Sequence, residues 1–375
     1  MKVVVLGAGR VGNAIARDLN QEEGLTVEVC DFSQKALDFL KEKGIATKKI
    51  DLSTKEGIEK AVESAEIVVG ALPGFMGFQC VKNVISFKKD IVDISFFPED
   101  PFLLDEEAKK NDVTCVVDAG IAPGCSNLIA GRMVTTLDEI ESLIIYVGGL
   151  PIERKWPFEY KAPFSPIDVI EEYTRPARLV KNGKIVTMEA LSESELVNFN
   201  GLGTLEAFNT DGLRTLLKTV KAKNMAEKTL RYLGHIEKIK ILRETGFFSK
   251  EKIEIDGKEI MPLELTSKLL FPLWSFSEGE EDLTVFRMEV KGKINGKNAT
   301  YKFELFDKMD LEKGISSMSR TTGYTATAMV RLILYKKFNE KGVFPPELIG
   351  KNIDNYLFVM RELGKRGVVF KETIN

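Results

Sequence analysis

A glycine-rich turn near the start of the chain is the feature that most constrains its fold. Residues 3–6 are apolar, and Gly7-Ala8-Gly9-Arg10-Val11-Gly12 follows them directly. A helical pattern comes next, and a second apolar segment ends in the acid Asp31. A strand, a glycine turn, a helix, a strand and an acid in this order are typical of a dinucleotide-binding domain.

Each glycine of this turn has a physical role. Gly7 allows the tight turn, and Gly9 has no Cβ, so the backbone can approach a pyrophosphate. Gly12 lets the helix lie close to the strand. The pyrophosphate would accept hydrogen bonds from free N–H groups at the helix N-terminus, so Arg10 and Val11 are also expected to bind the cofactor. The sequence therefore predicts a cofactor loop from Gly7 to Gly12.

Asp31 is predicted to select the cofactor. A carboxylate at this position accepts hydrogen bonds from ribose hydroxyls and repels a 2′-phosphate. Neither Phe32 nor Ser33 is a cation that would bind such a phosphate. We therefore expect NAD rather than NADP.

Strands and helices alternate up to residue 118, which predicts a doubly wound parallel sheet, an α/β Rossmann domain over residues 1–125. Residues 126–315 read as an α+β domain with an antiparallel sheet, because hairpin signals recur. Residues 316–375 return to helix and are expected to pack back on the first domain.

Several elements of the second and third parts can be placed along the chain. Hairpins are predicted around Asn182-Gly183, Asp256-Gly257 and Asn295-Gly296, since these pairs favour positive φ. Helices are predicted over residues 212–221 and 226–242, and a final strand over residues 367–370.

Composition narrows the function classes. The chain has 375 residues, a net charge of −3 and 44% apolar residues, so it offers no electrostatic case for nucleic acid or a membrane surface. It contains no basic leader and no apolar run of about 18–20 residues. Its four cysteines lack a CxxC pair and read as buried thiols in a reducing cytosol, so a cytoplasmic protein is expected.

Polar or small residues follow each predicted parallel strand, where ligands of such sheets bind. Asp51 would bind the adenine amino group, with Leu52 against the ring. The segment after the next strand is rich in small residues and contains a proline, and it would form a flat surface near the second ribose through Ala71, Leu72 and Pro73. Asp93, Ser95 and Asp118 would lie beside the nicotinamide, although an aspartate at a strand end is often a turn cap.

The middle of the chain holds clusters of cations and polar side chains. They contain Glu172, Tyr173, Arg175, Arg178, Asp211, Arg214 and His235. Paired arginines are typical of a carboxylate clamp, and the alternative is a set of surface salt bridges. A lone histidine is either a base or a core hydrogen-bonding group. No metal-ligand spacing and no GxSxG motif occurs, so neither a metal nor a hydrolase is expected.

Taken together, these segments resemble the saccharopine dehydrogenase family, and within it the lysine 6-dehydrogenase branch. The resemblance covers nearly the whole length. It rests above all on the segments Gly70–Phe75 (GALPGF), Asp118–Gly124 (DAGIAPG), Tyr173–Arg178 (YTRPAR), Asp211–Arg214 (DGLR) and Ser316–Arg320 (SSMSR).

The resemblance implies NAD-dependent oxidative deamination of L-lysine at its ε-carbon. The product is 2-aminoadipate 6-semialdehyde, which cyclises to 1-piperideine-6-carboxylate. It also implies a homodimer whose contacts lie in the catalytic domain. One alternative is a saccharopine dehydrogenase that acts on a secondary amine, and another is a catalytically silent NAD-binding regulator.

This chemistry sets demands on the residues. An alkylammonium with a pKa of about 10.4 must lose a proton before hydride transfer, which requires a base or a desolvating pocket. The candidate bases are Asp118, His235, Asp93 and Tyr173. The α-carboxylate of the substrate would bind Arg175, Arg178 and Arg214. Its α-ammonium would bind Asp211 or Glu172.

Overall fold

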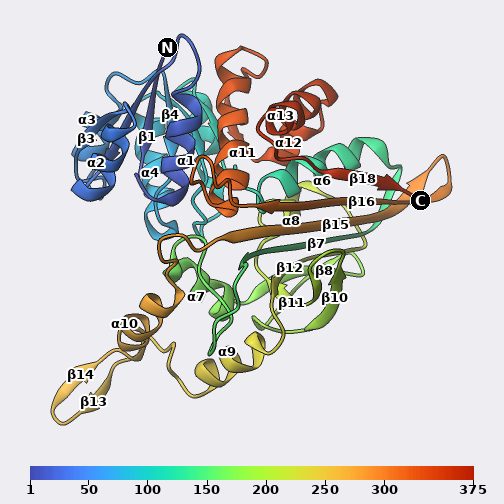
Figure 1. Ribbon diagram of the computed structural model, residues 1–375. Helices are drawn as coiled ribbons and strands as arrows, with labels where there is room; N and C mark the ends of the chain where they lie inside the picture. The colour runs from blue at the N-terminus through green and yellow to red at the C-terminus, as the bar shows by residue number, and fades with distance from the viewer. The chain divides into compact units, whose positions relative to one another are not determined.

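The computed structural model describes all residues from 1 to 375, and they form two compact units (Figure 1). Unit 1 contains Met1–Asp138, Lys218–Val220 and Ser319–Val369. Unit 2 contains Glu139–Leu217, Lys221–Met318 and Phe370–Asn375.

Unit 1 is built on a parallel seven-stranded sheet of order β17-β6-β5-β4-β1-β2-β3. This sheet confirms the predicted Rossmann-type fold. The strands are β1 (Lys2–Leu6), β2 (Thr26–Asp31), β3 (Ala46–Lys49), β4 (Ile67–Gly70), β5 (Asp90–Asp93), β6 (Thr114–Val116) and β17 (Gly342–Phe344).

Helices connect these strands, and α2 and α3 begin at side-chain caps. The hydroxyl of Ser33 accepts the Ala36 N–H at the start of α2, and that of Thr54 accepts the Gly57 N–H at the start of α3. The helices up to β17 are α1 (Arg10–Leu19), α2 (Gln34–Glu42), α3 (Lys55–Val62), α4 (Gly74–Ser86), the 3₁₀ turn η1 (Pro101–Leu104), α5 (Asp105–Lys110), α6 (Cys125–Thr136) and α11 (Ser317–Leu334). The helices after β17 are α12 (Pro346–Gly350) and α13 (Ile353–Lys365).

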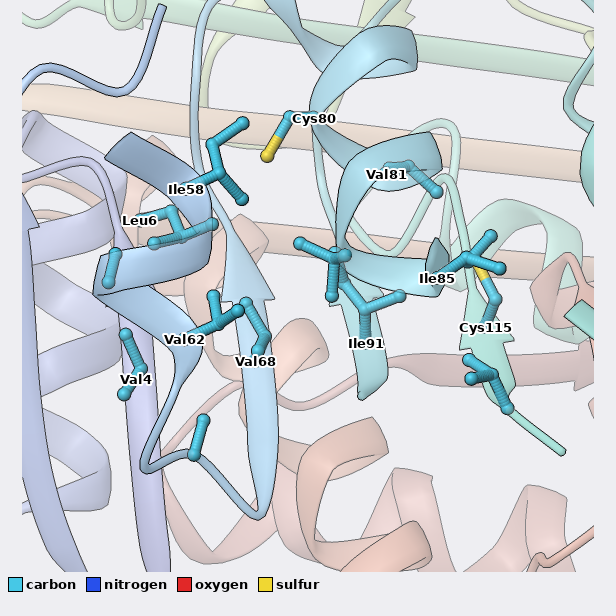
Figure 2. Close-up of a cluster of buried hydrophobic side chains, with 14 of the residues drawn as sticks. Val4, Leu6, Ile58, Val62, Val68, Cys80, Val81, Ile85, Ile91 and Cys115 are labelled. Atoms are coloured by element: carbon cyan, nitrogen blue, oxygen red, sulfur yellow. The ribbon is translucent and has the colours of Figure 1, made fainter. Parts of the chain in front are cut away.

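The core of unit 1 joins this sheet to α3 and α4 (Figure 2). Strand residues contribute apolar side chains with no exposed surface, and the helices contribute aliphatic side chains and a thiol. Those labelled in the figure are Val4, Leu6, Ile58, Val62, Val68, Cys80, Val81, Ile85, Ile91 and Cys115. All four cysteines of the chain are buried free thiols, as small apolar residues.

Unit 2 is built on a nine-stranded sheet whose main path is β10-β11-β12-β7-β15-β16-β18, with β8 and β9 attached at β12. Its pairs are antiparallel except β12 with β7, which run parallel. The strands are β7 (Glu139–Pro151), β8 (Ala177–Lys181), β9 (Lys184–Met188), β10 (Glu195–Phe199), β11 (Gly203–Thr210), β12 (Asn224–Arg231), β15 (Asp282–Ile294), β16 (Lys297–Lys308) and β18 (Lys371–Ile374).

The three predicted hairpins are confirmed. Asn182, Asp256 and Asn295 have φ values of 50°, 49° and 51°, and the glycine after each also has positive φ. The second hairpin is the separate pair β13 (Ile253–Ile255) and β14 (Lys258–Ile260). The helices of unit 2 are α7 (Pro166–Thr174), α9 (His235–Glu244) and α10 (Pro262–Trp274). The single turn α8 (Leu216–Thr219) begins in unit 2 and ends in the segment Lys218–Val220 of unit 1.

One long helix prediction was wrong. Residues 226–242 were expected to be helical, but residues up to Arg231 form β12, and α9 begins only at His235. Residues 225–231 are all buried, so two-faced burial in the sheet prevailed over local helical preference. Gly234, with φ of 81°, separates the two elements.

Smaller corrections concern the ends of other elements. The helix expected over residues 212–221 is only the turn α8. The last strand lies at Lys371–Ile374 rather than at residues 367–370, because it pairs with β16 from Tyr301 to Glu304. No helix of the chain combines the length and the apolar character needed to cross a membrane.

Candidate active site

The glycine turn between β1 and α1 has the geometry of a pyrophosphate loop. Gly7 has φ of 111°, and a Cβ there would lie 2.4 Å from the Ala71 carbonyl oxygen. A Cβ on Gly12 would lie 2.0 Å from the Gly7 oxygen, whereas a Cβ on Gly9 would meet nothing within 4 Å. No side chain caps the N-terminus of α1. The loop therefore fits an anionic group held by backbone N–H donors beside Gly9.

Asp31 ties the end of β2 to this loop. Its Oδ2 accepts the Ala8 N–H at 2.6 Å, and its Oδ1 accepts the Ser33 N–H at 2.7 Å. Each carboxylate oxygen retains a further lone pair, which a ribose hydroxyl can use. Phe32 beside it is 75% exposed and carries no charge. These contacts place the acid where the fingerprint of a dinucleotide site requires it.

The residues after β3 and β4 differ in accessibility. Asp51 is exposed, and its Oδ1 accepts the N–H and hydroxyl of Ser53, which lowers the pKa of the Asp51 carboxyl. Leu52 is buried in the core of unit 1 together with Ile58, which favours a packing role over contact with an adenine ring. The residues predicted to lie near the second ribose are partly exposed: Ala71, Leu72 and Pro73.

Asp93 at the end of β5 is fully buried. Its carboxylate accepts the Ser95 N–H at 2.9 Å and the Ser95 hydroxyl at 2.7 Å. A Cβ on Gly70 would lie 2.0 Å from Asp93 Oδ2, so the carboxylate packs tightly against the end of β4. This geometry favours the turn-capping alternative for Asp93 and Ser95.

Asp118 follows β6 and is 2% exposed, with φ of 53°. The next residue, Ala119, donates its N–H to the Asp93 carbonyl oxygen at 3.0 Å, so the ends of β5 and β6 are joined. A left-handed aspartate at this position is the kind of constrained residue often found at functional sites.

In unit 2, the structure brings Tyr173 and His235 together. Phe158 offers only a carbonyl oxygen to His235 Nδ1 at 3.0 Å, so Nδ1 carries the proton. His235 Nε2 then accepts the Tyr173 hydroxyl at 3.0 Å, and that hydroxyl oxygen accepts Arg231 Nε–H at 3.0 Å. The hydrogen bonds thus fix one tautomer of the histidine.

The titration of His235 and of Tyr173 is moved away from neutral pH. Burial, followed by the Arg231 charge, lowers the pKa of His235 to about 3. Burial raises the pKa of Tyr173 to about 12. Glu172, whose pKa burial also raises, forms an ion pair with Arg231 at 2.6 Å. The geometry therefore favours a structural role for His235 over that of a base.

The predicted clamp residues are also partly engaged within unit 2. Arg178 binds Asp211 through two parallel hydrogen bonds of 2.8 Å from Nε and Nη2. Arg175 lies 3.5 Å from Glu171, one turn earlier on α7. Arg214 is buried with φ of 52°.

Sequence reasoning missed two residues of β12, Arg231 and Glu227. Glu227 is 3% exposed, and burial raises its pKa to about 8. Both were hidden by the wrong helix prediction. The signal that would have found them is the alternation of Glu227, Thr229 and Arg231, which places polar side chains on one face of a strand.

No group of three or more histidine, cysteine, aspartate or glutamate side chains in the chain is arranged to hold a metal ion. A parallel sheet with an open glycine loop is typical of a dinucleotide-binding protein, and in this chain it is joined to a second, mixed-sheet unit that buries paired polar side chains.

Comparison with known proteins identifies the class more closely. The family profile described as saccharopine dehydrogenase NADP binding domain matches residues 3–116, and that described as saccharopine dehydrogenase C-terminal domain matches residues 120–368. The chain belongs to the saccharopine dehydrogenase family.

The names of curated relatives describe dehydrogenases and a semialdehyde synthase. Saccharopine dehydrogenase [NADP(+), L-glutamate-forming] of Schizosaccharomyces pombe is 24% identical, with 99% of this chain and 98% of that protein covered. Carboxyaminopropylagmatine dehydrogenase of Synechocystis is 22% identical, with 100% and 98% covered. Mitochondrial alpha-aminoadipic semialdehyde synthase of Mus musculus is 24% identical over 70% of this chain, and the matched region spans only 30% of that protein.

Among solved structures, apo saccharopine dehydrogenase (L-Glu forming) from Saccharomyces cerevisiae has the same fold. The TM-score is 0.82 at 20% identity, with 100% of this chain and 99% of that chain covered. The curated sequence of the L-glutamate-forming enzyme from the same yeast is 26% identical over 75% of this chain and 65% of that protein.

Proposed function

We propose that this protein is an NAD-dependent dehydrogenase that deaminates L-lysine oxidatively at its ε-carbon. The products are 2-aminoadipate 6-semialdehyde, which cyclises to 1-piperideine-6-carboxylate, together with ammonia and NADH. The bound nicotinamide supplies the hydride acceptor. Family membership and the Rossmann-type loop support the dehydrogenase, and two structural observations support the choice of cofactor and substrate.

The choice of NAD rests on Asp31. Its carboxylate stands at the end of β2, held to Ala8 and Ser33, and no cation occupies position 32 or 33. A 2′-phosphate would be repelled there. Several relatives carry NADP(+) in their names, so the cofactor is a point at which this chain is proposed to differ from them.

The choice of lysine rests on the ion pairs that the arginines of unit 2 form within the chain, and this is the observation on which the proposal mainly depends. Saccharopine has three carboxylates, and lysine has one. Arg178 is paired bidentately with Asp211, and Arg231 is paired with Glu172. These two guanidinium groups are bound to carboxylates of the chain, which favours a substrate with one carboxylate over a substrate with three. We assign that carboxylate to Arg175, which also contacts Glu171, and to Arg214.

Among the candidate bases, Asp118 is the one that we assign to accept a proton. His235 is held neutral by its two hydrogen bonds, and Tyr173 keeps its proton because burial raises its pKa. The Asp93 carboxylate already accepts hydrogen bonds from the N–H and the hydroxyl of Ser95. Asp118 would take the proton of the substrate ammonium or of the water that attacks the imine.

We also propose a cytoplasmic homodimer that binds no nucleic acid and no membrane. Helix α10 of unit 2 supports the dimer. One face packs in the core through Leu263, Leu270 and Trp274, while Leu265, Leu269 and Leu273 are 47–60% exposed at spacings of four residues. Such an apolar stripe is typical of a protein interface.

The test is reduction of NAD or NADP, followed by absorbance, with L-lysine and saccharopine as separate substrates. We expect NADH formation with lysine and little with saccharopine or NADP. Turnover of saccharopine alone would support the second candidate function, which the names of the curated relatives favour. Binding of NAD without turnover of either substrate would indicate a regulator.

A further inference from the structure

Glu227 of β12 lies against the turn that carries Asp211 and Arg214. In the sheet it stands opposite Thr210, the last residue of β11. The Glu227 carboxyl forms a short hydrogen bond with the Thr210 hydroxyl and accepts the Gly212 N–H. A Cβ on Gly212 would lie 2.3 Å from Glu227 Oε2. The carboxyl is therefore packed directly beneath the backbone of this turn.

The charged groups that face Glu227 are carboxylates rather than cations. Glu172 of α7 and Asp211 of the turn both act on it electrostatically. Arg231, from the same strand, is bonded to Glu172, and Arg178 of β8 is bonded to Asp211. No lysine or arginine forms an ion pair with Glu227. Burial is the main cause that raises its pKa to about 8, followed by Glu172 and Asp211, while the bonds from Thr210 and Gly212 oppose the shift.

We propose that Glu227 is a positioning residue which, as a neutral carboxylic acid, anchors the turn Asp211–Arg214 and so holds Arg214 in place for the substrate carboxylate. This inference rests on the proposed function, because that function assigns Arg214 to the substrate.

The turn needs such an anchor. Arg214 has φ of 52°, a conformation that a non-glycine residue keeps only where its surroundings hold it. The hydroxyls of Thr210 and Thr229 lie 2.9 Å apart and extend the hydrogen-bonded chain behind Glu227. When Glu227 loses its proton, a buried carboxylate faces those of Asp211 and Glu172, so repulsion opposes the packed turn.

The first test compares steady-state kinetics of Glu227→Gln and the native enzyme between about pH 6 and 9.5. Glutamine is neutral at every pH and still accepts the Gly212 N–H. We expect kcat within about twofold of the native value, and a lysine KM that no longer shows the native rise near pH 8. Glu227→Ala should have a KM about tenfold above the native value at pH 6, as for a loss of about 1.4 kcal/mol, and this KM should not rise further near pH 8. The control is Glu141→Gln, an exposed carboxylate on β7, which should behave as native.

Two kinetic outcomes would overturn the proposal. A fall in kcat of about a hundredfold in Glu227→Gln at unchanged KM would make Glu227 a catalytic base instead. An unchanged pH profile of KM in that variant would show that ionisation of Glu227 does not act on the turn.

A second readout needs no substrate. The infrared difference spectrum between native protein and Glu227→Gln should contain a protonated-carboxyl band at pH 6.5 that disappears as pH rises through about 8. Amide hydrogen exchange at Gly212 should be slow in both proteins and fast in Glu227→Ala. Absence of the band at pH 6.5 would overturn the inference, whereas the band without turnover of lysine would contradict the proposed function alone.

Discussion

Several buried polar side chains of unit 2 are joined to one another by hydrogen bonds. Arg231 serves two of them, because its Nε–H donates to Tyr173 and its Nη2 to Glu172. Tyr173 in turn donates to His235. Removal of one partner from such a group leaves another buried atom unsatisfied, which costs about 1–3 kcal/mol. The stability of this unit should therefore respond to changes at single polar atoms.

His235 should make the protein sensitive to acid. Its folded pKa of about 3 lies below its ordinary value of 6.5, so between these values the unfolded chain binds a proton that the folded protein does not. Stability should therefore fall as pH decreases through this window, by on the order of 1 kcal/mol per pH unit from this residue.

Chemical denaturation of native protein and His235→Gln at pH 7, 5.5 and 4.5 measures this contribution. The substitution should lower stability at pH 7, and the gap between the two proteins should narrow toward pH 4.5. Parallel pH profiles would show that His235 takes up its proton equally in both states.

The charge of Asp31 should determine the preference for NAD. Asp31→Asn removes the negative charge and keeps an acceptor oxygen for one of the two backbone N–H donors, Ala8 or Ser33. We expect kcat/KM with NAD to fall about tenfold, a loss of about 1.4 kcal/mol, and the preference over NADP to narrow. Asp38→Asn on the exposed side of α2 is the matched control. A native preference for NADP would contradict the assignment.

At the scale of elements, the loop between β1 and α1 offers a matched pair of glycines. A Cβ on Gly9 meets nothing, but a Cβ on Gly12 would overlap the Gly7 oxygen. Gly9→Ala should leave the melting temperature nearly unchanged and weaken dinucleotide binding at least about tenfold. Gly12→Ala should destabilise unit 1 by about 1–3 kcal/mol through overpacking.

Calorimetric melting and titration with NAD separate these effects. Equal loss of stability in both variants would contradict the view that the space beside Gly9 is reserved for a ligand.

The sequence predicted the elements whose signals are local. The glycine loop and the three hairpins depend on a few adjacent residues, and all of them appear in the structure. The segment of β12 was misread because it is a strand through its pairing with β11 and with the distant β7, and no pattern within the segment itself marks that pairing. The sequence did not predict that Arg178 binds Asp211 or that Arg231 binds Glu172, because the partners in each ion pair are separated in the chain and meet only in the folded structure.

At the scale of the whole molecule, the chain returns to unit 1 after unit 2. Buried charged side chains hold the returning segment, Ser319–Val369, to the N-terminal part of this unit. Asp18 of α1 accepts hydrogen bonds from Thr327 and Arg331 of α11 and from Arg366, just after α13. Asp18 is 7% exposed and Arg331 is 2% exposed. Loss of one partner in a buried network of this kind costs about 3–5 kcal/mol, so Asp18→Ala should unfold unit 1 at a markedly lower denaturant concentration.

Helix α10 gives a test of the proposed homodimer. A charge within its exposed stripe should weaken an apolar interface, so Leu269→Asp should shift the mass measured by light scattering from dimer toward monomer. Leu357→Asp, at a leucine of α13 that is 44% exposed, is the control. A dimer unchanged by Leu269→Asp would remove this helix from the interface.

The most direct measurement follows the nitrogen of the substrate. Incubation of the enzyme and NAD with L-lysine labelled by ¹⁵N at the ε-position should release one labelled ammonia for each NADH formed, and α-labelled lysine should release unlabelled ammonia. Labelled ammonia from the α-position would contradict ε-deamination. NADH formation from saccharopine alone, without ammonia, would assign the protein to the cleavage of secondary amines instead.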